Sequence, residues 1–174
     1  MDFRHLLRAL TNRSNGRLTT YSDRHRIAGL LSWIPIPLPS ILTLFGSDKQ
    51  RPGQHSYGAT YQALFSGLRY RRLKILEIGV QNGDSLLAWR AFFPRAVTVG
   101  IDLNDQRALS IGRRTRVYLG VQGSAADLRH ICNAEGPFDI VIDDGSHYSR
   151  HQLFTFQKVF PHVRNGGLYV IEDV

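Results

Sequence analysis

Cysteine is nearly absent from this chain, since Cys132 is the single cysteine in 174 residues. One cysteine excludes a disulfide framework and any zinc site built on several cysteines. Cys132 lies in a stretch with a helical pattern, where a lone thiol is typical of a small core residue. The low cysteine content favours an intracellular protein, and we expect it in the cytoplasm.

Acidic residues are also few, with 14 Asp and Glu against 22 Lys and Arg and a net charge of +8. A basic balance suits nucleic acid, anionic lipid or phosphorylated substrates. Many of the arginines gather near the N-terminus and at the predicted strand starts (Arg4, Arg8, Arg13, Arg17, Arg24, Arg26, Arg69, Arg71, Arg72, Arg113, Arg114 and Arg116). No zinc-finger, RNA-recognition or KH signature accompanies them. We therefore favour a solvated surface and expect no nucleic-acid partner.

Charge is missing altogether from the apolar stretch between residues 27 and 45. Pro35, Pro37 and Pro39 argue against one membrane-spanning helix, because each removes a backbone donor. The stretch follows an expected amphipathic basic helix over residues 2–10 and a linker over residues 11–23. It is interpreted as packing on the domain or on a second subunit, as lying on a membrane surface, or as poorly ordered. We treat residues 1–45 as an N-terminal region and 46–174 as the main domain.

Strand-like and helix-like segments alternate along the rest of the chain. Strands are expected at residues 72–78, 96–101, 116–121, 138–142 and 168–171, and helices at 84–93, 105–112, 124–133 and from Ser149 onward. The alternation predicts an α/β, Rossmann-like, doubly wound parallel sheet with strand order 3-2-1-4-5. The sequence stops after the fifth strand and looks truncated at its C-terminus, without the last strands of a complete sheet.

A glycine-containing loop follows the first predicted strand, running from Glu77 through Gly79 to Gly83 and Ser85. Glycines permit tight turns and the close approach of backbone to a ligand. The spacing is neither the dinucleotide fingerprint nor a P-loop, so it favours a cofactor without a pyrophosphate. Asp102 ends the second strand, where a carboxylate can accept hydrogen bonds from ribose hydroxyls.

Carboxylates also end the fourth and fifth strands. Asp144, Glu172 and Asp173 should lie at one sheet edge, where they repel one another unless they are protonated or bound to a cation. Oxygen ligands suit Mg²⁺ or a similar divalent ion. His147 follows Asp144 on the same loop and is a candidate general base. The alternatives are strand-end capping and surface charge for the acids, and a hydrogen-bond anchor for His147.

The pattern Glu77-x-Gly79-x-x-x-Gly83, followed by Asp102, resembles the first two motifs of class I S-adenosylmethionine-dependent methyltransferases. The resemblance implies that the glycine loop passes the methionine part of the cofactor, that Asp102 holds the ribose and that Gln122 lies near the adenine. The residues expected at the cofactor are Glu77, Gly79, Gly83, Ser85, Asp102, Gln122, Tyr57 and Asp143. A non-catalytic Rossmann-like domain is the alternative.

The runs 142–156 and 160–173 resemble one branch, the metal-dependent sugar O-methyltransferases of macrolide biosynthesis (demethylmacrocin type) and of mycobacterial sugars. The branch implies Asp144, Glu172 and Asp173 as Mg²⁺ ligands and His147 as the base. Residues 46–49 with His55, Tyr57 and Tyr61 resemble its segment that closes over the cofactor. The likeness covers residues 44–173. Where the branch often has Gly-Asp-Gln, this chain has Gly-Ser-Ala at 123–125.

We therefore predict methyl transfer from S-adenosylmethionine to a sugar hydroxyl of a glycosylated natural product, glycolipid or polysaccharide, assisted by Mg²⁺ and a histidine base. The alternatives are an inactive truncated remnant or cofactor-binding partner subunit and, less favoured, an RNA methyltransferase. A homo-oligomer and a peripheral contact of residues 1–45 with the inner face of the membrane are further expectations.

Overall fold

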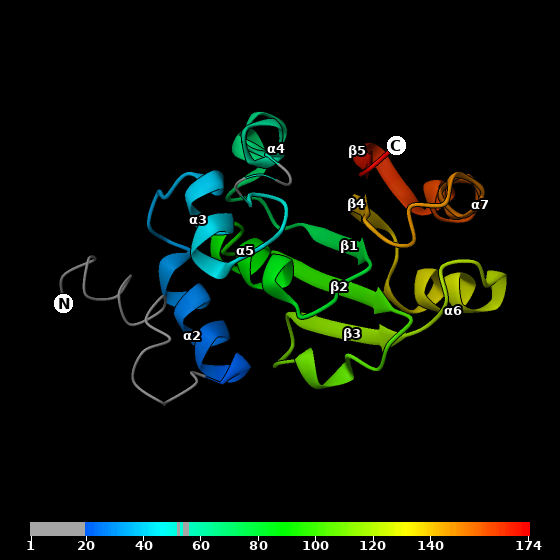
Figure 1. Ribbon diagram of the computed structural model, residues 1–174, viewed down its shortest axis with the longest axis horizontal. Coiled ribbons are helices and arrows are strands. Elements are labelled where there is room, and N and C mark those ends of the chain that lie inside the picture. Colours follow the sequence, from blue (N-terminus) through cyan, green and yellow to red (C-terminus); the bar gives the residue numbers. More distant parts are fainter. Residues whose placement is uncertain (1–19, 52, 54–55) are drawn as a thin grey trace. The chain divides into compact units, whose positions relative to one another are not determined.

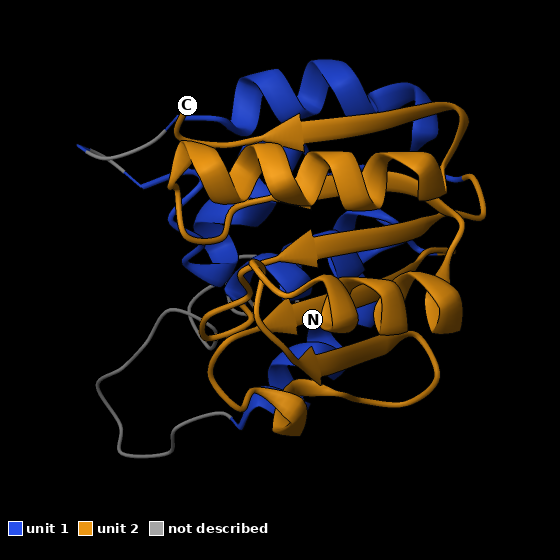
Figure 2. Cartoon of the chain, turned by 90° about the vertical axis from the view of Figure 1, so that its right-hand side faces the viewer, with its two compact units in different colours: residues 1–70, 84–94 blue, residues 71–83, 95–174 orange. Residues whose placement is uncertain are grey.

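The computed structural model describes residues 20–51, 53 and 56–174. The basic helix predicted over residues 2–10 lies outside the described residues, as does most of the predicted linker. The chain forms two compact units: residues 1–70 with 84–94, and residues 71–83 with 95–174 (Figure 2). This grouping divides the chain differently from the boundary expected between residues 45 and 46, which stays a prediction.

The second unit is built on a five-stranded, fully parallel sheet (Figure 1). Its strands are β1 (Lys74–Ile78), β2 (Val97–Asp102), β3 (Thr115–Leu119), β4 (Phe138–Asp143) and β5 (Val163–Ile171). They lie in the order β3-β2-β1-β4-β5. The predicted α/β fold class and strand order are confirmed. Because the strands are parallel, their carboxyl ends all meet at one edge, where ligands bind in such sheets.

Helices α6 (Ala125–Glu135) and α7 (Ser149–Val159) cover one face of this sheet (Figure 2). Their apolar side chains and those of the strands form one buried cluster (Leu76, Ile78, Val99, Ile101, Leu128, Ile131, Cys132, Phe138, Val141 and Val159). The prediction that Cys132 is a core residue is confirmed. Ser124 caps α6 by accepting a hydrogen bond from the backbone of Asp127 at 3.3 Å.

Three local predictions in this unit were wrong. The helix expected over 105–112 is a 3₁₀ turn at Arg107–Leu109, because the Asp105 carboxylate binds the Arg107 backbone and guanidinium and holds a turn. The expected cap Ser149 is the first residue of α7, and its N-cap is Tyr148. The fifth strand begins at Val163, earlier than predicted. Gly166 lies inside it with a left-handed φ of 77°, and the strand continues past it because the register against β4 shifts. The predicted glycine turn is therefore an irregularity within the strand.

The first unit contains α2 (Tyr21–Leu31), α3 (Leu38–Phe45), α4 (Gly58–Phe65) and α5 (Asp84–Phe92). Thr20 and Asp23 form a reciprocal capping box at the start of α2. The end of the predicted linker is therefore helical, which corrects that expectation. Aromatic side chains from α4 and α5 pack together, with ring centroids of Tyr61 and Trp89 at 5.3 Å.

The uncharged stretch over 27–45 is ordered, so the interpretation as a poorly ordered segment was wrong. It closes α2, crosses an extended turn and forms α3, with Pro39 in the first turn, where its missing N–H is tolerated. The Arg69 guanidinium donates to the carbonyl oxygens of Ile34 and Ile36 and fixes the proline turn. The stretch thus packs within its own unit, as one interpretation expected.

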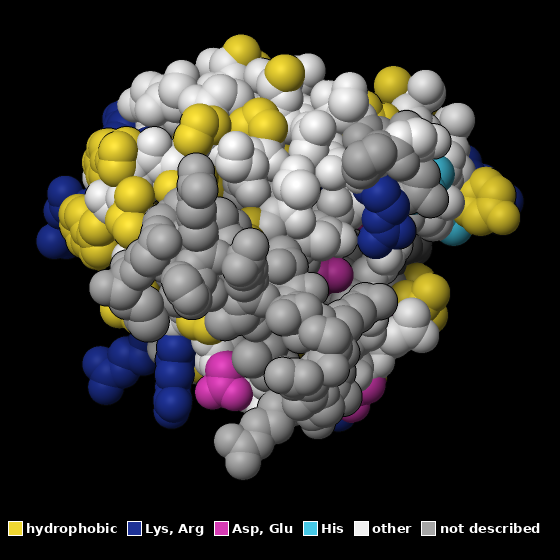
Figure 3. Space-filling model, turned by 60° about the vertical axis from the view of Figure 1, so that its left-hand side comes forward, with side chains coloured by type: hydrophobic (Ala, Val, Ile, Leu, Met, Phe, Trp, Pro, Cys, Tyr) yellow, Lys and Arg dark blue, Asp and Glu magenta, His cyan; other side chains and the backbone are white. Residues whose placement is uncertain are grey.

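Part of this stretch still faces solvent. Leu30, Trp33 and Ile34 are exposed, and Figure 3 shows hydrophobic side chains gathered at the surface near Lys and Arg. Among the described residues, no helix combines the length and apolar character needed to cross a bilayer. A second-subunit or membrane-surface contact of this region stays a prediction.

Candidate functional site

The glycine loop after β1 is shaped by Asp102 at the end of β2. The backbone N–H groups of Val80 and Gln81 both donate to Asp102 Oδ2 at 2.9 Å, and that of Asn104 donates to Oδ1 at 2.8 Å. A charged acceptor bound by backbone donors stabilises a tight loop. Asp102 therefore builds the loop, and its Oδ1 retains acceptor capacity for a ligand hydroxyl.

Gly79 brings this loop against the loop that follows β4. Its φ is 82°, and a Cβ there would lie 2.1 Å from the carbonyl oxygen of Asp144. Since no side chain fits, glycine is required both by conformation and by space. The backbone N–H of Asp144 donates to the Ile78 carbonyl at 2.9 Å, which ties the two loops together.

A cavity of about 260 Å³ opens at these strand ends. Its wall is made by the loops after β1, β2, β3 and β4 and by the start of α7 (Ile78, Gly79, Gln81, Ile101, Asp102, Leu103, Asn104, Gly120, Val121, Gln122, Gly123, Asp144, Gly145, Ser146 and His151). Its size is near the lower end of small-molecule pockets. The structure thus brings Gly79, Asp102, Gln122 and Asp144, all singled out from the sequence, around one cavity.

Gln122 joins the β3 and β4 sides of this cavity. Its Nε2 donates to Asp143 Oδ1 at 2.6 Å, and its Oε1 accepts from the Ser146 backbone at 2.9 Å. Asp143 is fully buried, and this burial raises its pKa to about 6. Gly145 leaves room for Gln122, because a Cβ there would lie 2.4 Å from Oε1. Asp143 is therefore placed beneath the cavity as a support for Gln122.

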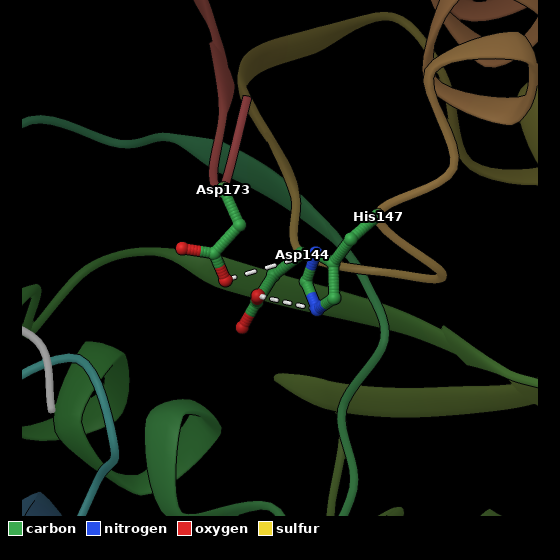
Figure 4. Close-up of side chains that lie close together, drawn as sticks. All are labelled: Asp144, His147 and Asp173. Atoms are coloured by element: carbon green, nitrogen blue, oxygen red, sulfur yellow. Dashed lines mark ion pairs between the residues drawn. The ribbon is translucent and has the colours of Figure 1, made fainter.

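Three side chains converge beside the cavity: Asp144 after β4, His147 on the same loop and Asp173 after β5 (Figure 4). One ligand atom from each lies within 4.8 Å of the others. His147 Nε2 is 3.9 Å from Asp144 Oδ1, and its Nδ1 is 3.8 Å from Asp173 Oδ2. His147 and Asp173 have left-handed φ values of 58° and 53°. Such strained backbone often accompanies functional sites.

Glu172, the third predicted metal ligand, lies next to this group in the chain and is buried. Its backbone N–H donates to Asp143 at 2.9 Å, and its carbonyl accepts from Gln152 at 2.9 Å. The converging group of three does not include its carboxylate. A role of Glu172 as ligand stays a prediction.

The remaining predicted cofactor residues lie outside the cavity wall. Glu77 is a buried position inside β1, and Gly83 closes the glycine loop by donating to Val80 at 2.8 Å. Ser85 in α5 and Tyr57 before α4 belong to the first unit. Their roles at the cofactor stay predictions.

Several wall residues received no role from the sequence. Gln81 has a left-handed φ of 43°, which no sequence rule assigns to glutamine. Ser146 and His151 are joined at 2.8 Å between Oγ and Nδ1. Ser146 lies just before α7 and His151 lies in its first turn. Because α7 begins at the edge where the strands end, this position in the sequence could have indicated that both residues lie near the site.

The model of a methyltransferase domain family matches residues 76–174, more than half of the chain. The chain belongs to this family. The match covers the parallel sheet from Leu76 within β1 onward and all the residues of the converging group.

Curated relatives of the chain are named as O-methyltransferases. The chain is 42% identical over 138 residues to 8-demethyl-8-alpha-L-rhamnosyl tetracenomycin-C 2'-O-methyltransferase of Streptomyces olivaceus, covering 74% of this chain and 35% of that protein. It is 40% identical over 127 residues to demethylmacrocin O-methyltransferase of Streptomyces fradiae, covering 69% and 32%. The predicted likeness to that branch is confirmed.

A solved structure agrees with both findings. The MycE methyltransferase of the mycinamycin biosynthetic pathway, in complex with Mg, SAH and mycinamycin VI, superposes with a TM-score of 0.75 at 39% identity, covering 79% of this chain and 39% of that one. The chain spans about a third of the length of the curated relatives it matches.

Proposed function

We propose that the whole protein transfers a methyl group from S-adenosylmethionine to a sugar hydroxyl, with Mg²⁺ and a histidine base. One observation carries the proposal: Asp144 belongs both to the cavity wall and to the converging group with His147 and Asp173. A methyl donor in the cavity and an acceptor at the converging group would therefore be neighbours. Such positioning accounts for much of the rate enhancement in group transfer.

The cavity fits a nucleoside-bearing cofactor. Asp102 Oδ1 accepts a hydrogen bond from the Asn104 backbone and keeps capacity for a ribose hydroxyl. Leu103 and Val121 line the cavity, although 71% and 49% of each is exposed. Apolar side chains exposed at a cavity suit the faces of a flat base. When bound, S-adenosylmethionine supplies an electrophilic methyl group.

The converging group fits a divalent cation. Mg²⁺ prefers oxygen ligands, so Asp144 and Asp173 would hold it, with Glu172 as the proposed third ligand. His147 is then left to act as the base, since a hard ion does not select its ring nitrogens. When bound, the cation supplies positive charge that lowers the pKa of the acceptor hydroxyl. His147 would take the hydroxyl proton on a ring nitrogen as the methyl group is transferred.

The acceptor class is inferred from the relatives. The names of the tetracenomycin and demethylmacrocin enzymes, and the mycinamycin bound to MycE, describe glycosylated natural products or their methylation. We extend this class of acceptor to the present protein. A cytoplasmic location, a homo-oligomer and a membrane contact through residues 1–45 are parts of the same proposal.

The test combines binding and turnover. Calorimetry should detect S-adenosylhomocysteine binding, and radiolabelled methyl from S-adenosylmethionine should appear on a glycosylated macrolide in the presence of Mg²⁺ but not of EDTA. His147→Ala should abolish turnover and leave cofactor binding intact, whereas His130→Ala, on the exposed side of α6, should change neither.

Each failure has its own meaning. Turnover by His147→Ala would exclude the base role, and turnover in EDTA would exclude the metal. Cofactor binding by the wild type without transfer to any sugar would favour the remnant or partner subunit.

A further inference from the structure

His151 is held at the cavity wall from two sides. Its Nδ1 lies 2.8 Å from Ser146 Oγ, and its ring meets the Tyr148 ring edge-on at 5.6 Å between centroids. Its backbone N–H donates to the Tyr148 carbonyl at 2.7 Å in the first turn of α7. An imidazole fixed through one nitrogen presents the other in a defined direction.

The second ring nitrogen of His151 lies at the end of the cavity near β3. A Cβ added to Gly123 would meet His151 Nε2 at 3.6 Å, so this nitrogen lies over the Gly123 backbone. Among the described residues, Nε2 has no hydrogen-bond partner. Gly123 and His151 both line the cavity, and the absence of a side chain at Gly123 leaves the space beside this nitrogen open.

The other polar side chains at this end are already engaged. The oxygen and nitrogen of the Gln122 amide bond Ser146 and Asp143, and Ser124 Oγ caps α6. Val121 is apolar. If Asp102 holds the ribose and the glycine loop passes the methionine part, the base lies beyond Asp102, toward Gly123. His151 Nε2 is then a side-chain polar atom on the β3 side of the cavity that is available to the edge of that base.

We propose that His151 recognises the edge of the cofactor's nucleobase, and that Ser146 is a positioning residue that orients its ring. The inference rests on the proposed function, since it needs an adenosyl cofactor in the cavity. Gln122, which was expected near the adenine, then supports the cavity wall. The specific contact to the base is made by His151 at the start of α7. The serine hydroxyl can donate to Nδ1 or accept from it, so the contact fixes the direction in which the ring presents Nε2 and leaves that nitrogen to accept from the base or donate to it.

The experiment measures the dissociation constants of S-adenosylhomocysteine and three base analogues by calorimetry: the inosyl, 3-deaza and 7-deaza compounds. His151→Asn keeps a polar group near Nδ1 and removes Nε2. It should weaken binding of the parent compound by about five- to tenfold, the effect of one hydrogen bond. The preference of the wild type against at least one analogue should fall toward one. His151→Gln, which restores a polar group near Nε2, should recover part of it.

Ser146→Ala should reduce the preference for S-adenosylhomocysteine over the base analogue to a smaller extent than His151→Asn does. Ser146→Thr, which keeps the hydroxyl, should retain the wild-type preference. His130→Gln is the matched histidine control and should change neither affinity nor preference. Unchanged ratios for all three analogues in His151→Asn would overturn the inference, even if its affinity fell. Absence of S-adenosylhomocysteine binding by the wild type would instead overturn the proposed function on which the inference rests.

Discussion

The cavity and the converging group lie at the same sheet edge but are built in opposite ways. At the cavity, Asp102 and Gln122 are held in place by hydrogen bonds of 2.6–2.9 Å within the chain itself. In the converging group, His147 lies 3.8 and 3.9 Å from the two acids, beyond direct hydrogen bonds. The cavity is held by backbone and side-chain hydrogen bonds of the chain itself, whereas the three side chains of the group converge at distances that would suit a cation between them.

This contrast predicts that the two regions can be broken separately. Hydrogen bonds within the protein hold the cavity, so substitutions there should lower the affinity for the cofactor. The converging group brings negative charges together, so substitutions there should lower the affinity for a cation. Variants that affect both equally would show that the two regions form one unit.

Asp173→Asn should have the largest effect and should lower the affinity for the cation without changing that for the cofactor. Removing one of the carboxylates lowers the charge offered to a hard ion, and we expect Mn²⁺ or Mg²⁺ affinity to fall by about 100-fold. Asp173 is not part of the cavity wall, so S-adenosylhomocysteine affinity should change by less than about twofold. Electron paramagnetic resonance of Mn²⁺ measures the first quantity and calorimetry the second. The control is Asp105→Asn, an exposed acid bound to Arg107. Unaltered cation affinity in Asp173→Asn would refute the site.

Asp102→Asn should have the next largest effect and the reverse pattern. Its Oδ2 accepts two backbone N–H groups, and an amide in its place removes the charge and turns a donor toward one of the two oxygen sites. Cofactor affinity should fall by about ten- to a hundredfold, since charge-assisted bonds are lost. Cation affinity should be retained. Equal loss of both ligands would contradict the separation.

Gly145→Ala tests how tightly Gln122 is held. The added Cβ would press on Gln122 Oε1, so the bonds to Asp143 and Ser146 must lengthen. We expect unfolding free energy to fall by about 1–2 kcal/mol in chemical denaturation, with a modest loss of cofactor affinity. Gly67→Ala is the matched control, because a Cβ there meets open space. Equal stability of the two variants would show that Gln122 moves freely.

The sheet and its acidic edge were predictable because they follow from local pattern. Apolar strands that end in acids, such as the runs before Asp102 and Asp144, fix both the strand positions and the edge at which the acids meet. The glycine loop was predictable for the same reason, since Gly79 stands between a strand and a helix. These features depend on residues close together in the chain.

The remaining features depend on pairs far apart in the chain. Gln122 and Asp143 are 21 residues apart, and their bond exists because the β3 and β4 loops meet in space. Gly166 was predicted in a turn, yet the pairing of β5 with β4 continues on both sides of it. His151 received no role because its place at the cavity follows from how α7 begins. Tertiary contacts decide such cases, and local propensity does not record them.

The smallest expected effect is the further slowing of Cys132 labelling by bound cofactor, which tests the core beneath both regions. Burial raises the pKa of the Cys132 thiol to about 11, so at pH 8 the group is protonated as well as shielded. Because the thiolate is the reacting species, a disulfide reagent should label the folded chain at least about 100-fold more slowly than the unfolded chain. As Cys132 is the single cysteine, the labelling rate reports α6 alone.

A saturating cofactor should slow the labelling of Cys132 further if binding at the cavity stabilises the sheet under it. Asp102→Asn should remove that added protection and Asp173→Asn should keep it. Equal protection in both variants would show that the cavity and the converging group are not independent.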